Sequence, residues 1–459
     1  MKKRTFIIYS ILFALLCPVF RLVAEDATVV KADPYLGKKL IAKTYNSGFS
    51  MAHDTYNGMS VASDGKVYYV LCAQSIDDAG QMYSFDPKSG IIKHLGDLTE
   101  ACGEKGLHAV AQGKIHVNFI ESKGKLYFST HIGYNGEKDG QVTIGTPPPG
   151  YKPFQGGHIL SYDLKSGKFE NIALEPHHEG IITMNMDTLR GMIYGISWPS
   201  GSFFRYDLAK KEMMDLGPIS GKGGLGKGDE FRTLCRTIAI NPDDGTAYFT
   251  TSEGTIKECR YGQNKIEIVE GDDLKKDYFG VYNPSESGHM GYNWRQVIWY
   301  PLEKKFYGVH GNSGYLFSFD PNKSNVEVLE RITSESSKRS GMYDQFSFGY
   351  LGFALGPDKR TLYYLTGGPI YINGKRLVGI TKSNTGVAKS RENLHLITYD
   401  IPTSKYTDHG AVFYADGQPP LYVNSIAIGH DGTVYSLARI TENGKTRTDL
   451  ISIPNPLKE

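Results

Sequence analysis

The sequence predicts an all-β protein built as a seven-bladed β-propeller, and three observations lead to this fold class. A short run of aromatic and polar residues ending in Tyr-Asp or Phe-Asp recurs at residues 82–86, 160–163, 204–207, 317–320 and 396–400. Ahead of it recur an apolar strand, a polar turn and a second strand that contains a tyrosine. The 53 glycines and 31 tyrosines suit many short strands joined by tight turns. Such a repeat buries its apolar face only by stacking on neighbouring copies.

The tyrosines of the second strands set the order of the blades. They lie 54 to 72 residues apart, which fits a four-stranded blade with loops, and are Tyr68, Tyr127, Tyr194, Tyr248, Tyr307, Tyr363 and Tyr435. Each copy is expected to contain an inner strand, the tyrosine strand, the Tyr-Asp strand and an outer strand. Residues 259–262 form a degraded Tyr-Asp copy in the fourth blade. Turns of the Asp-Gly type supply the positive φ angles of the inner hairpins.

The last copy explains how the ring is expected to close. Residues 423–454 supply only three strands before the sequence ends. We therefore expect residues 39–45 to pair with the last blade as its outer strand. This pairing removes two unpaired sheet edges at once.

The two ends and the composition bound the class of protein. Residues 1–24 have the pattern of a signal peptide, with a basic start, an apolar run and small residues at its end. We expect export to the periplasm or the cell exterior, and residues 25–459 as a single propeller domain. The apolar run is too short for a membrane span. The net charge of +2 gives no support for nucleic-acid binding, and we expect a monomer.

Four cysteines follow the expected signal peptide. They are Cys72, Cys102, Cys235 and Cys259. The sequence leaves open whether they form disulfides, in any of three pairings, or remain buried thiols. No spacing typical of a zinc site is present.

Aligning the copies predicts which residues meet at one mouth of the central channel. Polar residues near the start of the inner strands are Asn57, His116, Arg236, Arg295 and Asn424. Residues that follow the tyrosine strands at the same end are His131, Trp198, Ser252, His310 and Gly367. Tyr292 and Trp294 are expected at this mouth by register, and with Trp198 they could stack on sugar faces. Arginine suits a carboxylate or phosphate, so the expected ligand is an anion.

The second blade carries the richest group of candidates. Its inner strand is expected to open at residues 114–119, and the hairpin then brings His116 and His131 to the same end. Tyr134 follows on the loop. Two histidines and a tyrosine beside arginines can remove a proton next to a carboxylate and protonate a leaving oxygen. Arginine then stabilises the enolate-like intermediate.

Several other chemistries lack support in the sequence. GxSxG, HExxH and Walker motifs are absent. Asp86, Asp163 and Asp207 recur in phase with the repeat, so they read as turn residues, and they do not identify a glycosidase carboxylate pair. No cofactor is required by this reading. A structural divalent metal stays open, because several other histidines are present without a compact ligand spacing.

These features resemble the exported seven-bladed propeller carbohydrate enzymes of glycan-degrading bacteria. That group includes ulvan lyases, rhamnose–glucuronate lyases and related rhamnosidases. The resemblance rests on the architecture, on His116 and His131 with Tyr134, and on arginines facing the channel. It implies that His116, His131 and Tyr134 act as acid and base, and that Arg236 and Arg295 hold the carboxylate of a uronate.

The leading hypothesis is therefore an exported polysaccharide lyase that cleaves a uronic-acid-containing glycan by β-elimination. Trp198, His310, Asn424 and Tyr292 are expected to help bind the acidic oligosaccharide or polysaccharide. A glycoside hydrolase that releases a sugar such as rhamnose from a uronate is the first alternative. A non-catalytic propeller that binds a glycan or a protein is the second. A quinone-dependent propeller dehydrogenase ranks lower, since only three tryptophans are present.

Overall fold

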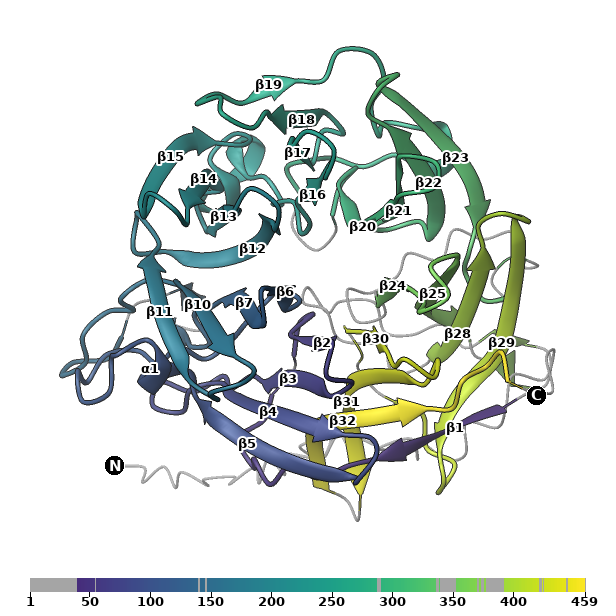
Figure 1. The fold of residues 1–459 in the computed structure, drawn as a ribbon, viewed down its shortest axis with the longest axis horizontal. Helices are drawn as coiled ribbons and strands as arrows, with labels where there is room; N and C mark the ends of the chain where they lie inside the picture. The colour runs from purple at the N-terminus through teal and green to yellow at the C-terminus, as the bar shows by residue number, and fades with distance from the viewer. Residues whose placement is uncertain are drawn as a thin grey trace, which may run out of the picture.

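The fold is a β-propeller, described here from a computed structural model. The structure describes residues 39–53, 55–138, 141–144, 147–286, 290–335, 338, 352–369, 371–372, 375–376, 392–420, 423, 425–442 and 445–458. The expected signal peptide, the boundary at residue 25 and Asn424 lie outside these residues. Figure 1 shows sheets arranged around a common centre, with the first strand of each four-stranded sheet nearest to it.

Within the described residues, five sheets have four strands, each in the order of the chain. They comprise β2 (Met59–Val61), β3 (Val67–Leu71), β4 (Gln81–Asp86) and β5 (Ile91–Asp97); β6 (Ile120–Ser122), β7 (Lys125–Ser129), β10 (His158–Asp163) and β11 (Phe169–Leu174); β12 (Gly180–Asp187), β13 (Met192–Trp198), β14 (Ser202–Asp207) and β15 (Glu212–Pro218); β16 (Ala239–Ile240), β17 (Ala247–Thr250), β18 (Ile256–Cys259) and β19 (Glu267–Ile268); and β20 (Trp294–Tyr300), β21 (Lys305–His310), β22 (Tyr315–Asp320) and β23 (Asn325–Arg331).

The remaining large sheet has eight strands in the order β24-β25-β28-β29-β1-β32-β31-β30. These are β24 (Phe353–Leu355), β25 (Thr361–Pro369), β28 (Glu392–Asp400), β29 (Lys405–Tyr414), β1 (Lys39–Thr44), β32 (Lys445–Ile453), β31 (Val434–Glu442) and β30 (Ala427–Ile428). β1 pairs parallel with β29 and antiparallel with β32. The N-terminal strand therefore lies between two strands from the C-terminal part of the chain, and it joins their edges (Figure 1).

Short elements decorate the loops. They are two hairpins, β8 (Asn135–Lys138) with β9 (Gln141–Ile144) and β26 (Tyr371–Ile372) with β27 (Lys375–Arg376), the helix α1 (Leu98–Ala101), and the 3₁₀ turns η1 (Gly223–Leu225), η2 (Gly228–Glu230) and η3 (Asp277–Phe279). Among the described residues, no helix is long and apolar enough to cross a membrane.

The predicted strand order is confirmed along the chain. All seven repeat tyrosines lie in the second strand of their runs, namely β3, β7, β13, β17, β21, β25 and β31. The Tyr-Asp copies lie in the third strands β4, β10, β14, β22 and β28, and the degraded copy lies in β18 and the turn after it. Aspartates of this phrase accept backbone N–H groups of the following turn, as Asp163 does from Lys165 and Ser166. They are turn residues, as their periodic recurrence indicates.

One predicted strand is wrong. Residues 114–119 were expected to open the inner strand of the second blade, but β6 begins only at Ile120. Before it, Lys114 forms a single antiparallel bridge with His131, and the segment then runs without a ladder along the channel.

Side chains of the inner strands link neighbouring sheets around the channel. Each donates a hydrogen bond to a backbone carbonyl of the next sheet: Ser60 to Phe119 at 3.0 Å, Thr183 to Arg236 at 3.1 Å, Asn185 to Ile238 at 2.7 Å and Thr237 to Arg295 at 2.7 Å. These bonds satisfy carbonyls at a sheet edge that has no further strand. They also fix the backbone of Arg236 and Arg295.

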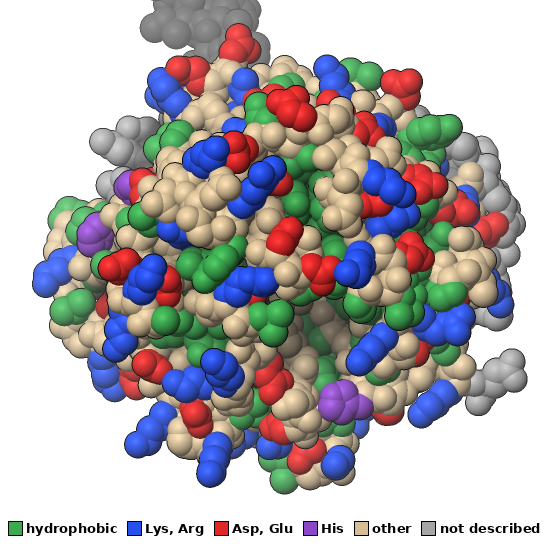
Figure 2. All heavy atoms as spheres, turned by 45° about the horizontal axis from the view of Figure 1, so that its top comes forward, with side chains coloured by type: hydrophobic (Ala, Val, Ile, Leu, Met, Phe, Trp, Pro, Cys, Tyr) green, Lys and Arg blue, Asp and Glu red, His purple; other side chains and the backbone are tan. Residues whose placement is uncertain are grey.

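The four cysteines are buried free thiols, which answers the question that the sequence left open. On the surface, Lys and Arg side chains are mixed with Asp and Glu on the face shown in Figure 2. This mixture agrees with the near-neutral net charge.

Candidate functional site

Two histidines from the second sheet lie in contact, as the spacing predicted. The rings of His116 and His131 have centroids 4.4 Å apart and planes tilted by 49°. The bridge between Lys114 and His131 sets this geometry: each backbone N–H donates to the other residue's carbonyl, at 3.0 and 2.7 Å. His116 follows two residues after Lys114 and so returns to the same end of the hairpin.

The protonation of His131 is determined by its neighbours. Its Nδ1 lies 2.9 Å from the carbonyl oxygen of Ile132, so Nδ1 carries the hydrogen and donates it. Nε2 then holds a lone pair, and this buried atom has no hydrogen-bond partner in the described structure. An unpaired acceptor in a buried position is costly and is often functional.

Both histidines are uncharged. Burial lowers the pKa of His131 to about 3, against the opposing effect of its bond to Ile132, and the charges of Lys114 and Arg236 lower it further. Burial also places the pKa of His116 well below its usual value, and His131, Arg236, Lys114 and Arg295 add to this effect. The charged groups among these neighbours, Lys114, Arg236 and Arg295, are all cationic, so the site attracts an anion.

Aromatic rings cover both ends of the pair. Tyr56 stacks on His116 at 4.4 Å and 15°, while Trp198 lies 5.0 Å from His131. Lys114 Nζ is 5.4 Å from the centre of the Tyr56 ring. The sequence did not predict Lys114 and Tyr56 as site residues. The signal for both was present, because Tyr56 precedes the channel residue Asn57 and Lys114 stands two residues before His116.

The loop that carries Trp198 is held by two glutamates. Glu179 accepts hydrogen bonds from the backbone N–H and the hydroxyl of Ser200, at 2.9 and 2.6 Å. Glu175 accepts a bond from the hydroxyl of Ser197. The space beside His131 admits no side chain at Gly180, because an added Cβ there would lie 2.8 Å from the imidazole. The segment that connects the second and third sheets therefore fixes the Trp198 loop through its glutamates and packs against the ring of His131 at Gly180.

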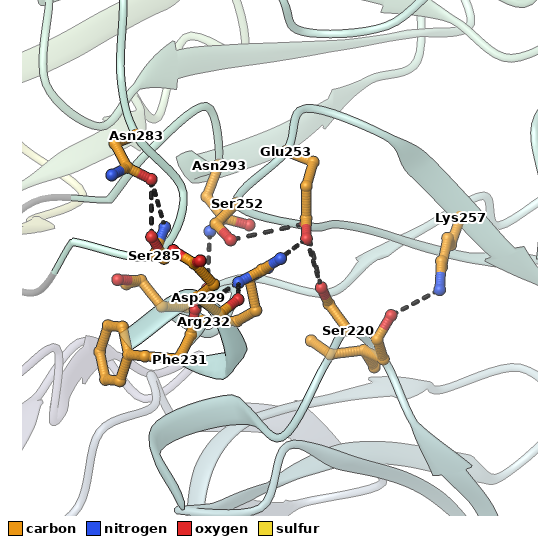
Figure 3. A network of polar contacts seen from close by, with 12 residues as sticks. Ser220, Asp229, Phe231, Arg232, Ser252, Glu253, Lys257, Asn283, Ser285 and Asn293 are labelled. Atoms are coloured by element: carbon orange, nitrogen blue, oxygen red, sulfur yellow. Dashed lines mark hydrogen bonds and ion pairs between the residues drawn. The ribbon is translucent and has the colours of Figure 1, made fainter. Parts of the chain in front are cut away.

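An insertion at residues 219–234 builds a wall beside Trp198. The backbone N–H of Gly224 donates to the carbonyl of Pro199 at 2.8 Å, which docks η1 against the Trp198 loop. Figure 3 shows how the insertion is anchored: Arg232 bonds to Glu253, and Ser220 donates to both carboxylate oxygens of Glu253 at 2.9 and 3.0 Å. Glu253 lies on the loop after β17, so the wall is attached to the fourth sheet.

The two predicted arginines lie near His116, and one of them, Arg236, lines the channel cavity. Arg236 and His116 line the same cavity, and both arginines lower the pKa of His116. Arg295 is 5% exposed. The structure therefore brings His116, His131, Arg236 and Arg295 into one electrostatic cluster, with Trp198 at its edge.

Other predicted residues make different contacts. Tyr134 packs with Trp198 against the small apolar cluster of Val110, Ile132 and Phe154. Ser252 and His310 are buried, Ser252 donating to Glu253.

Three rings expected at the mouth belong to the interior instead. Tyr292 is 4% exposed and accepts the N–H of Tyr282, and Trp294 is fully buried with its indole N–H donating to Thr237. His310 is fully buried, stacks on Phe279 at 4.2 Å and bonds to Ser313. Phe279 and Tyr282, from a loop that the repeat register cannot show, pack against Tyr292 and His310. These rings do not offer a face to a sugar.

The described residues hold no group of three His, Cys, Asp or Glu side chains arranged for a metal ion. Two other histidines are tied to carboxylates within the sheets. His158 lies 2.8 Å from Glu104, and His395 lies 3.1 Å from Asp408, so both read as structural.

No protein-family model and no curated protein matches the chain. Solved structures with a similar fold include a chain of the mitotic checkpoint complex, with 10% identity, a TM-score of 0.47 and coverage of 98% of this chain and 99% of that chain. A putative 6-phosphogluconolactonase from Bacteroides fragilis has 12% identity, a TM-score of 0.48 and coverage of 84% and 94%. A β-propeller domain from Myceliophteria thermophila has 11% identity, a TM-score of 0.46 and coverage of 90% of this chain and 99% of that chain. Similarity at this level does not carry a function from one protein to another.

Proposed function

We propose that this protein is an exported lyase that cleaves a uronic-acid-containing glycan by β-elimination. The observation that carries the proposal is the contact between two uncharged histidines among Lys114, Arg236 and Arg295. A uronate carboxylate supplies the anion that such a site attracts. Lys114, Arg236 and Arg295 are the charged groups that lower the pKa of these histidines, and such a cationic site suits β-elimination beside a carboxylate better than hydrolysis by two carboxyl groups.

In the proposed reaction, His131 Nε2 accepts the proton from C5 of the uronate. The electron pair of the C5–H bond forms the C4=C5 double bond, the C4–O4 bond breaks, and O4 leaves with a proton. The cations hold the charge that develops on the carboxylate. His116, which contacts His131, is the candidate proton donor, and Tyr134 is the alternative. The bound carboxylate also raises the pKa of the histidines by offsetting the positive charges around them.

The architecture that supports this site is proposed as a seven-bladed ring. The eight-stranded sheet counts as two four-stranded blades joined at their edges, one of which contains β1 as its outer strand. Limited proteolysis that removes residues 39–45 should then lower the thermal midpoint sharply, because it exposes the edges of β29 and β32 together.

The test is product analysis on acidic polysaccharides, including rhamnose–glucuronate types. A lyase yields a product that is lighter than the hydrolytic product by one water and that absorbs in the ultraviolet through its conjugated double bond. His131→Ala should lower kcat by roughly 10²–10⁴-fold. His94→Ala is the matched control, because His94 is exposed on the outer strand β5. Products with the full mass of water added would identify a hydrolase and refute elimination.

A non-catalytic glycan-binding propeller is the second candidate. The low pKa of His131 favours it, since a base of this strength removes a carbon-bound proton poorly unless the substrate raises that pKa. If the protein only binds, titration with an acidic oligosaccharide should give the same affinity for wild type and His131→Ala, with no product in either case.

A further inference from the structure

The central channel contains a cavity of about 180 Å³. Its lining comes from the inner segments of six successive strand runs, those of β2, β6, β12, β16, β20 and β24. His116 and Arg236 are part of this lining, so the cavity touches one histidine of the pair and one of the cations. Its volume is below the range of about 300–1,000 Å³ that encloses drug-sized ligands, and it suits a single sugar ring.

A hydrogen bond across the channel limits what can enter. Gln296 Nε2 donates to Asn57 Oδ1 at 2.8 Å and thereby joins the fifth strand run to the first. Gln296 also accepts the backbone N–H of Phe353 at 3.2 Å, so its position is fixed from both sides. Asn57 and Gln296 are only 6% and 8% exposed. This buried polar pair closes the channel to a polymer that would run through it.

We call the hydrogen-bonded pair of Asn57 and Gln296 the crossbar. It lies close to His116 along the channel axis. His116 lies outside β6, which begins at Ile120, so its position relative to the crossbar comes from the cavity. Asn57, His116 and Gln296 line this cavity together. A ring that contacts His116 in the cavity therefore meets the crossbar directly.

We propose that the cavity receives the uronate at the reducing end of a chain, and that the protein releases unsaturated monosaccharides one at a time. This inference rests on the proposed lyase function. A uronate whose carboxylate lies against Arg236 is enclosed by the channel lining and has no room for a further sugar on C1. The chain can then continue only through O4, which is the bond that β-elimination breaks.

The chemistry balances without another reactant. The proton leaves C5, the C4=C5 bond forms, and the C4–O4 bond breaks. The shortened chain leaves as an alcohol with the proton on its former O4. The enclosed ring leaves as an unsaturated monouronate, and the next reducing-end uronate takes its place when the sequence of the glycan supplies one.

The test uses two matched hexasaccharides of alternating rhamnose and glucuronate, both with glucuronate at the reducing end. One has a free C1 hydroxyl and the other carries a naphthyl group on C1 as a glycoside. Products are followed in time by mass spectrometry, which detects the unsaturated monouronate whether or not it rearranges to its open-chain isomer.

The expected result is that the unsaturated monouronate is the first product from the free hexasaccharide, and that the naphthyl glycoside is cleaved at least tenfold more slowly. Unsaturated trisaccharides and pentasaccharides formed at equal rates from both would overturn the inference while leaving the lyase function intact. Formation of no unsaturated product from either hexasaccharide or from any glycan of the panel would overturn both.

Discussion

Replacement of His310 by phenylalanine tests how strongly a buried, uncharged histidine makes this propeller sensitive to acid. His310 is fully buried, its ring lies parallel to Phe279 at 5°, and its Nε2 has no hydrogen-bond partner in the described structure. Phenylalanine keeps the stacked ring but cannot be protonated. The variant therefore removes one titrating group with little change in the packing around it.

The size of the effect follows from the two pKa values. Burial lowers the pKa of His310 to about 3 in the folded protein, whereas an unfolded histidine titrates near about 6.5. The stability that this group contributes is present above the unfolded pKa and is lost as the pH falls, because the unfolded state then binds the extra proton. The loss approaches about 1.4 kcal/mol per pH unit below the unfolded pKa and totals roughly 2 kcal/mol between about pH 6.5 and about pH 4.5.

Urea unfolding at a series of pH values measures this difference. The free energy of unfolding should fall less steeply for His310→Phe than for wild type, by about one proton between about pH 6.5 and about pH 4.5. Ser313→Ala is the control, because it removes the 2.9 Å bond to His310 Nδ1 and leaves the titrating ring in place. It should lower stability at every pH and keep the wild-type slope. Equal slopes for wild type and His310→Phe would refute the assigned pKa.

Two further predictions concern the arginines and the thiols. Arg236→Ala and Arg295→Ala should each weaken binding of a uronate oligosaccharide roughly 10- to 100-fold, since a charged hydrogen bond contributes about 1.5–3 kcal/mol, while binding of a neutral oligosaccharide of equal length changes little; equal losses for both ligands in calorimetric titration would argue against a carboxylate clamp. Cys72, Cys102, Cys235 and Cys259 are buried free thiols, so a thiol reagent should label none of them in the native protein and all of them in urea. A reductant should leave the thermal midpoint unchanged, and a drop would indicate a disulfide.

Much of the fold could be predicted from the sequence because the residues that specify each strand run lie close together in the chain and recur in every copy. The tyrosine of each second strand and the aspartate that ends each third strand recur with the period of one strand run, and the same packing and turn requirements act at every copy. Tyr68 in β3 and Tyr435 in β31 are found from this pattern alone. The register also brought His116 and His131 to one end of a hairpin.

The predictions of individual site residues failed where a loop or a neighbouring sheet, and not the repeat, determines the surroundings of a side chain. Tyr292 and His310 were expected at the mouth, but both are buried, with Phe279 and Tyr282 packed against them. Tyr56 reaches His116 from another sheet, and no spacing within the second repeat shows this contact. Lys114 acts on both histidines through space, although the sequence placed it only as the start of a strand.

The sequence by itself determined the all-β repeat, the order of its strands and the pair of histidines, because each of these depends on residues close together in the chain. Only the tertiary structure decided that these histidines are uncharged, that Tyr56 and Trp198 cover them, and that Asn57 and Gln296 close the channel. The physical reason is that burial and long-range electrostatics depend on which sheets meet at the axis. Residues 239 positions apart in the chain share one hydrogen bond there.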